Sequence, residues 1–307
     1  MAACLSPHLI LSSNWRRSST TRPGQLPKGD PMDWSRPPAV AGMFYPDREA
    51  TLRSDVEGLL AAAAEAERGE ARGDGRPVQT SGRPKALIAP HAGYVYSGPV
   101  AASAYVRLVP FKGSIRRVVL LGPAHRYPLR GLAASSAVAF QTPLGMVPVD
   151  GEGVRAALEL DQVVLLDEAH EGEHSLEVHL PFLQMVLGDF ALIPLVVGES
   201  PPEDVAEVLK TLWGGSETLI VVSSDLSHYL PYSQANEVDA LTALAIQDLR
   251  PEEIRHSQAC GRTPMGGLLL RAREEGLSVE CVDLRNSGDT AGPRNQVVGY
   301  GSFVFRG

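Results

Sequence analysis

Three histidines in this chain each follow a short apolar stretch that ends in turn-forming residues. They are His91 after residues 86–89, His125 after residues 117–121, and His228 after residues 219–222. Apolar runs of this length, bounded by turn formers, are typical of buried strands. In α/β proteins the carboxyl ends of such strands form the edge of the sheet where ligands bind. The pattern favours a shared site over three separate loop or capping roles.

Cys260 offers a different kind of ligand, a thiol. It lies in a glycine-rich turn that enters a helix expected from Pro264. A thiol near a helix N-terminus tends to be acidified, so Cys260 is a candidate metal ligand or nucleophile. The alternative is ordinary buried packing, which is the interpretation for Cys281 inside an apolar strand. Two imidazole nitrogens and one thiolate can hold a transition metal and leave positions open.

An acid and a histidine follow the third apolar stretch, at Asp225 and His228. Next to a metal, these two residues would form an acid/base pair, with the carboxylate orienting or charging the imidazole. The chain has no Gly-x-Ser-x-Gly motif and nothing like a phosphate-binding loop. A serine hydrolase is therefore disfavoured.

The stretch from Asp167 to Leu183 holds three of the eight histidines and five acids. If it is helical from Glu173, then His174 and Glu177 share one face at three-residue spacing. Two interpretations stay open. The stretch is either a capped helix start with solvated acids, or it brings His174 and Glu177 to the pocket behind the metal ligands.

Composition excludes several classes of protein. The chain has 307 residues, of which 44% are hydrophobic and 21% charged, with a formal net charge of −8. An acidic chain is unsuited to general nucleic-acid binding, which needs a basic face. No stretch of eighteen uncharged apolar residues exists, so no membrane span is expected. The three cysteines form no close pair, which predicts a reducing, cytoplasmic location.

Residues 1–31 differ from the rest, because four basic residues precede the first acid, Asp30. This segment is either a targeting peptide or, as we favour, a disordered or wrongly assigned leader before Met32. We expect residues 32–307 to form one domain. Its strands alternate with helices expected over 47–68, 234–249 and 264–275, which predicts an α/β three-layer sandwich around a central mixed sheet. Residues 296–305 should form a strand that pairs with 279–284.

Seven motifs in order resemble the Memo family over residues 36–305. They are RPPAVAGMFYP (36–46), PHAGYVYSG (90–98), LGPAH (121–125), EHSLEVHLP (173–181), SSDLSHY (223–229), CGRTPMG (260–266) and VGYGSFVF (298–305). That family is similar in fold to class III extradiol dioxygenases, which cleave catechol-like rings with non-haem Fe(II). The resemblance therefore implies a dioxygenase-like α/β fold.

The resemblance also implies site residues. The metal ligands would be His91, His125 and Cys260, with Fe(II) as the expected metal and copper as the alternative. Asp225 and His228 would lie in the same pocket, His228 where the dioxygenases keep an acid/base histidine. Further candidates for the pocket, or for a place behind the ligands, are Tyr94 and, from their spacing, His174 and Glu177. The dioxygenases have a glutamate where this chain has Cys260, so metal binding does not imply ring cleavage.

Two classes of function follow from these expectations. The first is a metal-dependent redox enzyme acting on a small molecule or a partner protein. The second is a binding module whose cleft recognises a peptide, with a phosphopeptide-type ligand by analogy with the family. Prokaryotic relatives are linked with a radical-SAM protein and a small companion domain, so such a companion is the expected partner in a prokaryote. Neither class involves nucleic acid or a membrane.

Overall fold

The structure is a computed structural model that describes residues 34–73 and 82–307. The expectations for residues 1–31 fall outside the described part of the chain. The described residues belong to one compact unit.

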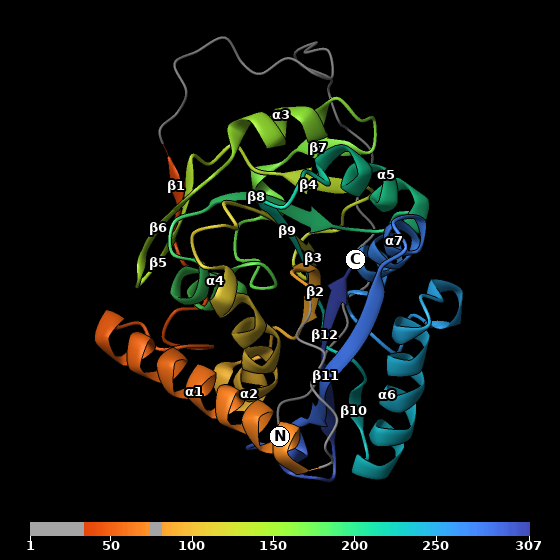
Figure 1. The fold of residues 1–307 in the computed structure, drawn as a ribbon. Helices are drawn as coiled ribbons and strands as arrows, with labels where there is room; N and C mark the ends of the chain where they lie inside the picture. The colour runs from red at the N-terminus through yellow and green to blue at the C-terminus, as the bar shows by residue number, and fades with distance from the viewer. Residues whose placement is uncertain (1–33, 74–81) are drawn as a thin grey trace, which may run out of the picture. The chain divides into compact units, whose positions relative to one another are not determined.

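The core of this unit is a mixed sheet (Figure 1). Its strands run in the order β10-β12-β2-β9-β3-β8-β4-β7, with β11 paired to β12. Strands β2, β9, β3 and β8 are parallel neighbours, whereas β12 is antiparallel to β2 and β4 is antiparallel to β8. The strand bounds are β2 Pro84–Ala89, β3 Arg117–Pro123, β4 Leu132–Ala134, β7 Val163–Leu165, β8 Ala191–Val197, β9 Thr218–Ser223, β10 His228–Leu230, β11 Ser278–Asn286 and β12 Val297–Arg306.

Helices cover both faces of this sheet, because successive strand residues point to opposite sides. Leu87 and Leu120 pack into one apolar cluster and their neighbours Ile88 and Leu121 pack into a second. The first cluster includes residues of α1 (Glu49–Gly73), α2 (Tyr94–Tyr105) and α4 (Leu180–Leu187), and the second includes residues of α3 (Gly151–Leu158), α5 (Pro202–Leu212), α6 (Tyr232–Gln247) and α7 (Arg262–Glu274). The predicted three-layer α/β sandwich with a central mixed sheet is confirmed.

A small second sheet carries the first described residues. Strand β1 (Ser35–Arg36) lies parallel to β5 (Ala139–Thr142), which pairs antiparallel with β6 (Gly145–Pro148). The stretch from Leu132 to Phe140 is divided between the two sheets, since β4 belongs to the central sheet and β5 to the small one. Short 3-10 turns complete the connections: η1 Val106–Phe111, η2 Asp167–Ala169, η3 Glu177–His179, η4 Pro251–Glu253 and η5 Ser287–Asp289.

Most expected elements are present with shifted ends. Helix α1 continues to Gly73, α7 begins at Arg262, and β11 pairs with β12 as expected. The segment after Asp167 differs, because regular helix begins only at Leu180. Gly172 has a φ of +72°, a left-handed conformation that ends any helical run. In the described part of the chain, no helix combines the length and apolarity that a membrane span requires.

Two histidines are buried in the core on the α4 side. His170 and His179 are each 1% exposed. The Tyr105 hydroxyl lies 2.7 Å from His179 Nδ1, and the Ala133 carbonyl oxygen lies 3.0 Å from His170 Nε2. Burial lowers the pKa of His170 to about 4 and that of His179 to about 3, since the charged form is poorly solvated there. Both rings are therefore neutral in the folded chain at neutral pH.

Because both rings stay neutral in the folded chain, we predict that the free energy of unfolding falls as the pH is lowered. Below about pH 6.5 the unfolded chain binds protons that the folded chain excludes, so the free energy of unfolding falls by up to about 1.4 kcal/mol per pH unit for each ring. This loss continues until the pH reaches the lowered folded-state pKa. In metal-free protein, urea unfolding of His179→Gln should show a shallower dependence on pH than wild type. The exposed His256→Gln variant is the control and should keep the wild-type slope. Identical slopes for His179→Gln and wild type would contradict this account.

Candidate metal centre

Three histidines converge at the edge of the central sheet. One ring nitrogen from each of His91, His125 and His174 lies within 4.8 Å of the others. His91 and His125 each follow the end of a parallel strand by two residues, β2 and β3 respectively. The rings of His125 and His174 stack with centroids 4.7 Å apart, and the His91 ring meets both edge-on at 5.1 and 5.4 Å. The strand-end pattern thus finds two members of this group, and the third comes from the loop before α4.

The buried carboxylate of Glu173 orients His125. Its Oε2 accepts the backbone N–H of His125 at 2.6 Å, and its Oε1 lies 3.0 Å from His125 Nδ1. A carboxylate can only accept, so Nδ1 carries a hydrogen, and in the neutral ring the lone pair is then on Nε2. Burial by itself raises the pKa of Glu173, but hydrogen bonds from His125 and Ser175 outweigh it and lower the pKa to about 2. Glu173 is therefore a fixed negative charge next to the three imidazoles.

His174 is held less tightly than His125. Its backbone N–H donates to Glu173 Oε1 at 2.9 Å. Its Nδ1 lies 3.4 Å from the same oxygen and makes no hydrogen bond within the described residues. The ring packs against Phe44 with centroids 4.9 Å apart. Burial lowers the pKa of His174 to about 4, and burial followed by repulsion from the neighbouring histidines lowers that of His91 well below its ordinary value. Neutral imidazole is the form that binds metals.

The loop that carries His174 is fastened to the end of β3. The Ser175 hydroxyl donates to the Pro123 carbonyl at 2.9 Å. A Cβ placed on Gly122 would lie 2.6 Å from that hydroxyl oxygen, so the close approach requires glycine. This contact holds the loop of His174 against the end of β3, which His125 follows.

An ion pair between Arg36 of β1 and Glu177 also holds the loop that carries His174. Arg36 Nη1 lies 2.7 Å from Glu177 Oε2, and the guanidinium also donates to the carbonyls of His170 and Glu173. The Glu177 carboxylate accepts further hydrogen bonds from Ala39 N–H, Val40 N–H and the Tyr45 hydroxyl. With all these donors around it, Glu177 has no capacity left for the metal centre. Glu177 therefore anchors the loop that carries His174, and Glu173 is the acid that contacts the histidines.

Tyr94 also has a supporting position. It is buried, it packs against Phe182 with ring centroids 4.9 Å apart, and its hydroxyl donates to the Val178 carbonyl at 2.8 Å. Its hydroxyl is therefore engaged in the core.

Cys260 borders the three histidines. Its Sγ lies 3.5 Å from His91 Nε2 and accepts the backbone N–H of Asp225 at 3.3 Å. Burial, followed by the nearby Asp225 carboxylate, raises the pKa of the thiol to about 12. The expectation that the helix N-terminus acidifies this thiol is wrong, because burial outweighs any effect of α7, which begins two residues later. Without a metal, Cys260 is a neutral thiol.

Asp225 and His228 interact electrostatically, but different groups hold them in place. Asp225 Oδ1 accepts the backbone N–H of His91 at 2.8 Å, and burial raises the pKa of Asp225 to about 6. His228 is exposed, and its Nδ1 lies 2.8 Å from the Leu226 carbonyl oxygen. A carbonyl accepts, so His228 carries its hydrogen on Nδ1 and leaves Nε2 free. The Leu226 carbonyl, and not the Asp225 carboxylate, orients this imidazole.

Two cavities lie next to the centre. One, of about 600 Å³, has Cys260 in its wall, together with Ala124, Tyr127, Arg130, Glu199, His256 and Thr263. The other, of about 1190 Å³, lies between α1, α2 and β11 and is bordered by Phe44, which packs on His174. The smaller cavity gives a ligand access to the thiol side of the centre.

The sequence contained a signal for His174 that depends on secondary structure. Residues 170–174 read His-Glu-Gly-Glu-His, which on a helix would place two histidines on one face for zinc. Here the stretch turns at Gly172, His170 is buried against Ala133, and only His174 reaches the centre. Glu173 could be found only once this turn was known.

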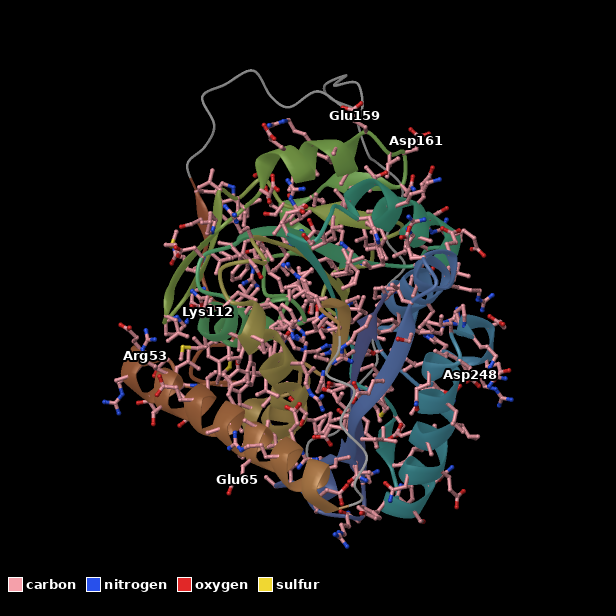
Figure 2. All side chains as sticks on the ribbon, viewed as in Figure 1. Arg53, Glu65, Lys112, Glu159, Asp161 and Asp248 are labelled. Atoms are coloured by element: carbon pink, nitrogen blue, oxygen red, sulfur yellow. The ribbon has the colours of Figure 1, made fainter. Side chains whose placement is uncertain are left out.

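We predict that removing the Arg36 guanidinium destabilises the fold strongly. Arg36→Met removes the charged partner of the buried Glu177 carboxylate and one donor from each of two loop carbonyls, which should reduce the free energy of unfolding by about 3–5 kcal/mol. Arg53 is the matched control, because it projects outward from α1 (Figure 2) and pairs with Glu49 at the surface. Arg53→Met should cost less than about 1 kcal/mol in the same urea unfolding experiment. Equal losses of unfolding free energy in the two variants would show that the buried Arg36 contacts stabilise the fold no more than a surface ion pair does.

Comparison with known proteins places the chain in a family. Residues 36–304 match the family described as Memo-like protein. A MEMO1 family protein of Sulfolobus acidocaldarius is 37% identical over 288 residues, covering 88% of this chain and 99% of that protein. One from Aquifex aeolicus is 36% identical over 282 residues, covering 88% and 98%.

A solved structure agrees at the level of the fold. The crystal structure of an uncharacterized protein from Escherichia coli K12 superposes with a TM-score of 0.51 at 14% identity, covering 73% of this chain and all of that one. The family match and the relatives extend over nearly the whole described chain and confirm the resemblance seen in the sequence motifs. The chain belongs to the Memo family.

Proposed function

We propose that this chain binds a redox-active transition metal, Fe(II) in the first place and copper as the alternative, and acts on a small molecule or a partner protein. The observation that carries the proposal is the convergence of three imidazoles, with nitrogens within 4.8 Å of one another. Two ligands bound at about 2.0–2.3 Å from one metal are separated by about 3–4 Å, so small adjustments suffice. Because burial lowers the pKa values of His91 and His174, these two rings need not lose a proton to bind, which favours binding at neutral pH.

The donor set suits these metals. Imidazole nitrogens bind iron, copper and zinc, whereas a carboxylate-rich set would select magnesium or calcium. The Glu173 carboxylate lies behind His125 and raises the basicity of its free nitrogen. A bound ion of this kind would supply Lewis acidity or electron transfer to a ligand in an open position.

Cys260 is proposed as a ligand for soft metals. Its Sγ is 3.5 Å from His91 Nε2, beside the three-histidine group. A thiolate favours Cu(I) and Zn(II) over Fe(II), and binding must first displace the thiol proton. The ligand set implied by the resemblance, His91, His125 and Cys260, would then apply to copper, and the three histidines would hold Fe(II).

His228 is the proposed acid/base residue. Its exposed imidazole has Nδ1 fixed by the Leu226 carbonyl and Nε2 free to exchange a proton with a bound molecule. Asp225 supports the centre from behind through the His91 backbone and the Cys260 thiol. The cavity of about 600 Å³ beside Cys260 offers a route for the substrate.

Metal titrations of two variants separate these ligand roles. His174→Ala should weaken Co(II) binding, used as a stable substitute for Fe(II), by at least about tenfold, equivalent to about 1.4 kcal/mol. Cys260→Ser should leave Co(II) affinity nearly unchanged and weaken Cu(I) binding by at least about tenfold, since it removes the soft donor. His256→Ala, which changes an exposed histidine in the wall of the smaller cavity, is the control for both metals.

If Co(II) affinity instead falls in Cys260→Ser and stays unchanged in His174→Ala, Cys260 is the third ligand for both metals. If the wild-type chain binds neither metal more tightly than His91→Ala does, the metal function is excluded. The better account would then be a binding module with a phosphopeptide-type ligand in the same cleft.

A further inference from the structure

We propose that Ser223 is a positioning residue that fixes His91 in the tautomer with hydrogen on Nδ1 and a free lone pair on Nε2. This inference deepens the proposed metal site and rests on it for its purpose. The hydrogen-bond chain that carries it exists in the metal-free protein.

Ser223 is the last residue of β9 and is fully buried. Its Oγ lies 2.5 Å from His91 Nδ1 and 2.6 Å from the Ser175 carbonyl oxygen. Both distances are those of short hydrogen bonds, and a serine hydroxyl has a single hydrogen to donate.

The donor in each of these two hydrogen bonds follows from the Ser175 carbonyl, the last group in the series. A carbonyl oxygen can only accept, so the Ser223 hydroxyl donates to Ser175. Ser223 Oγ must then accept at His91, and the hydrogen between the two belongs to Nδ1. The Nε2 of neutral His91 is therefore left as a lone pair, on the side where Cys260 Sγ lies 3.5 Å away.

These hydrogen bonds also connect the ends of β9 and β2 with the loop of His174. Ser175 is the residue after His174, and its backbone N–H donates to Glu173 Oε1 at 2.9 Å. Glu173 in turn fixes the hydrogen of His125 on Nδ1. Ser223 thus does for His91, through a hydroxyl, what Glu173 does for His125 through a carboxylate. Partners of this outer kind typically change metal affinity by about 10–100-fold when they are removed.

The test is the tautomer of His91 in metal-free protein labelled with nitrogen-15 in its histidines. The wild-type spectrum should show a protonated Nδ1 and an unprotonated Nε2 for His91. In Ser223→Ala the acceptor is gone, so the form with hydrogen on Nε2 should make up about half of the His91 population or more. Ser223→Thr keeps the hydroxyl and should restore the wild-type tautomer.

Ser302→Ala is the matched control. Ser302 is also fully buried and donates to a backbone carbonyl, that of Val100, at 2.6 Å. Ser302→Ala should lower the free energy of unfolding by about as much as Ser223→Ala does, without changing the His91 spectrum. A wild-type His91 with its hydrogen on Nε2 would overturn the proposal, even if Ser223→Ala does not fold. An unchanged tautomer in folded Ser223→Ala would also overturn it.

Co(II) affinity, measured separately, distinguishes this proposal from the proposed function. Ser223→Ala should bind Co(II) at least about tenfold more weakly than wild type, and Ser302→Ala should match wild type. If the tautomer changes as expected but the wild-type chain binds no metal, Ser223 positions His91 as proposed and the metal function fails. Full Co(II) affinity in a Ser223→Ala protein with the changed tautomer would overturn the claim that this tautomer prepares His91 for the metal.

Discussion

The arrangement of the centre depends on one buried carboxylate. Glu173 is 2% exposed and accepts the backbone N–H groups of His125, His174 and Ser175 as well as the Nδ1 hydrogen of His125. A buried charge without partners is expensive, so these donors must stay in place while Glu173 is ionised. The same carboxylate therefore shapes the loop, sets the tautomer of one histidine and places a negative charge behind a candidate metal.

The fold supplies the remaining constraints. Parallel strands β2, β3 and β9 end at one edge of the sheet, which brings His91, His125 and Ser223 together although they are far apart in sequence. The loop of His174 cannot rely on strand geometry, so it is fastened by Ser175 to β3 and by the Arg36–Glu177 pair to the end of β1. This explains how residues near the start of the described chain contribute to a site built on the central sheet.

The sequence allows the fold and half of the site to be predicted, for physical reasons. Apolar runs ending in turn formers identify buried strands, and two such ends locate His91 and His125. The loop from Asp167 to His179 was beyond prediction, because its shape depends on the left-handed turn at Gly172 and on tertiary contacts of Arg36. Helical spacing drew attention to Glu177, whereas Glu173 is the acid that contacts His125. For Cys260, the rule that a helix N-terminus acidifies a thiol failed, since burial had the larger effect.

The central claim is that His91, His125 and His174 hold one metal ion. Anomalous diffraction from crystals grown with Fe(II) in the absence of oxygen, recorded on both sides of the iron absorption edge, tests it directly. The account predicts one strong peak per chain, at about 2.0–2.3 Å from a ring nitrogen of each histidine. A peak bound by Cys260 without His174, a peak elsewhere on the chain, or no peak at all would contradict it.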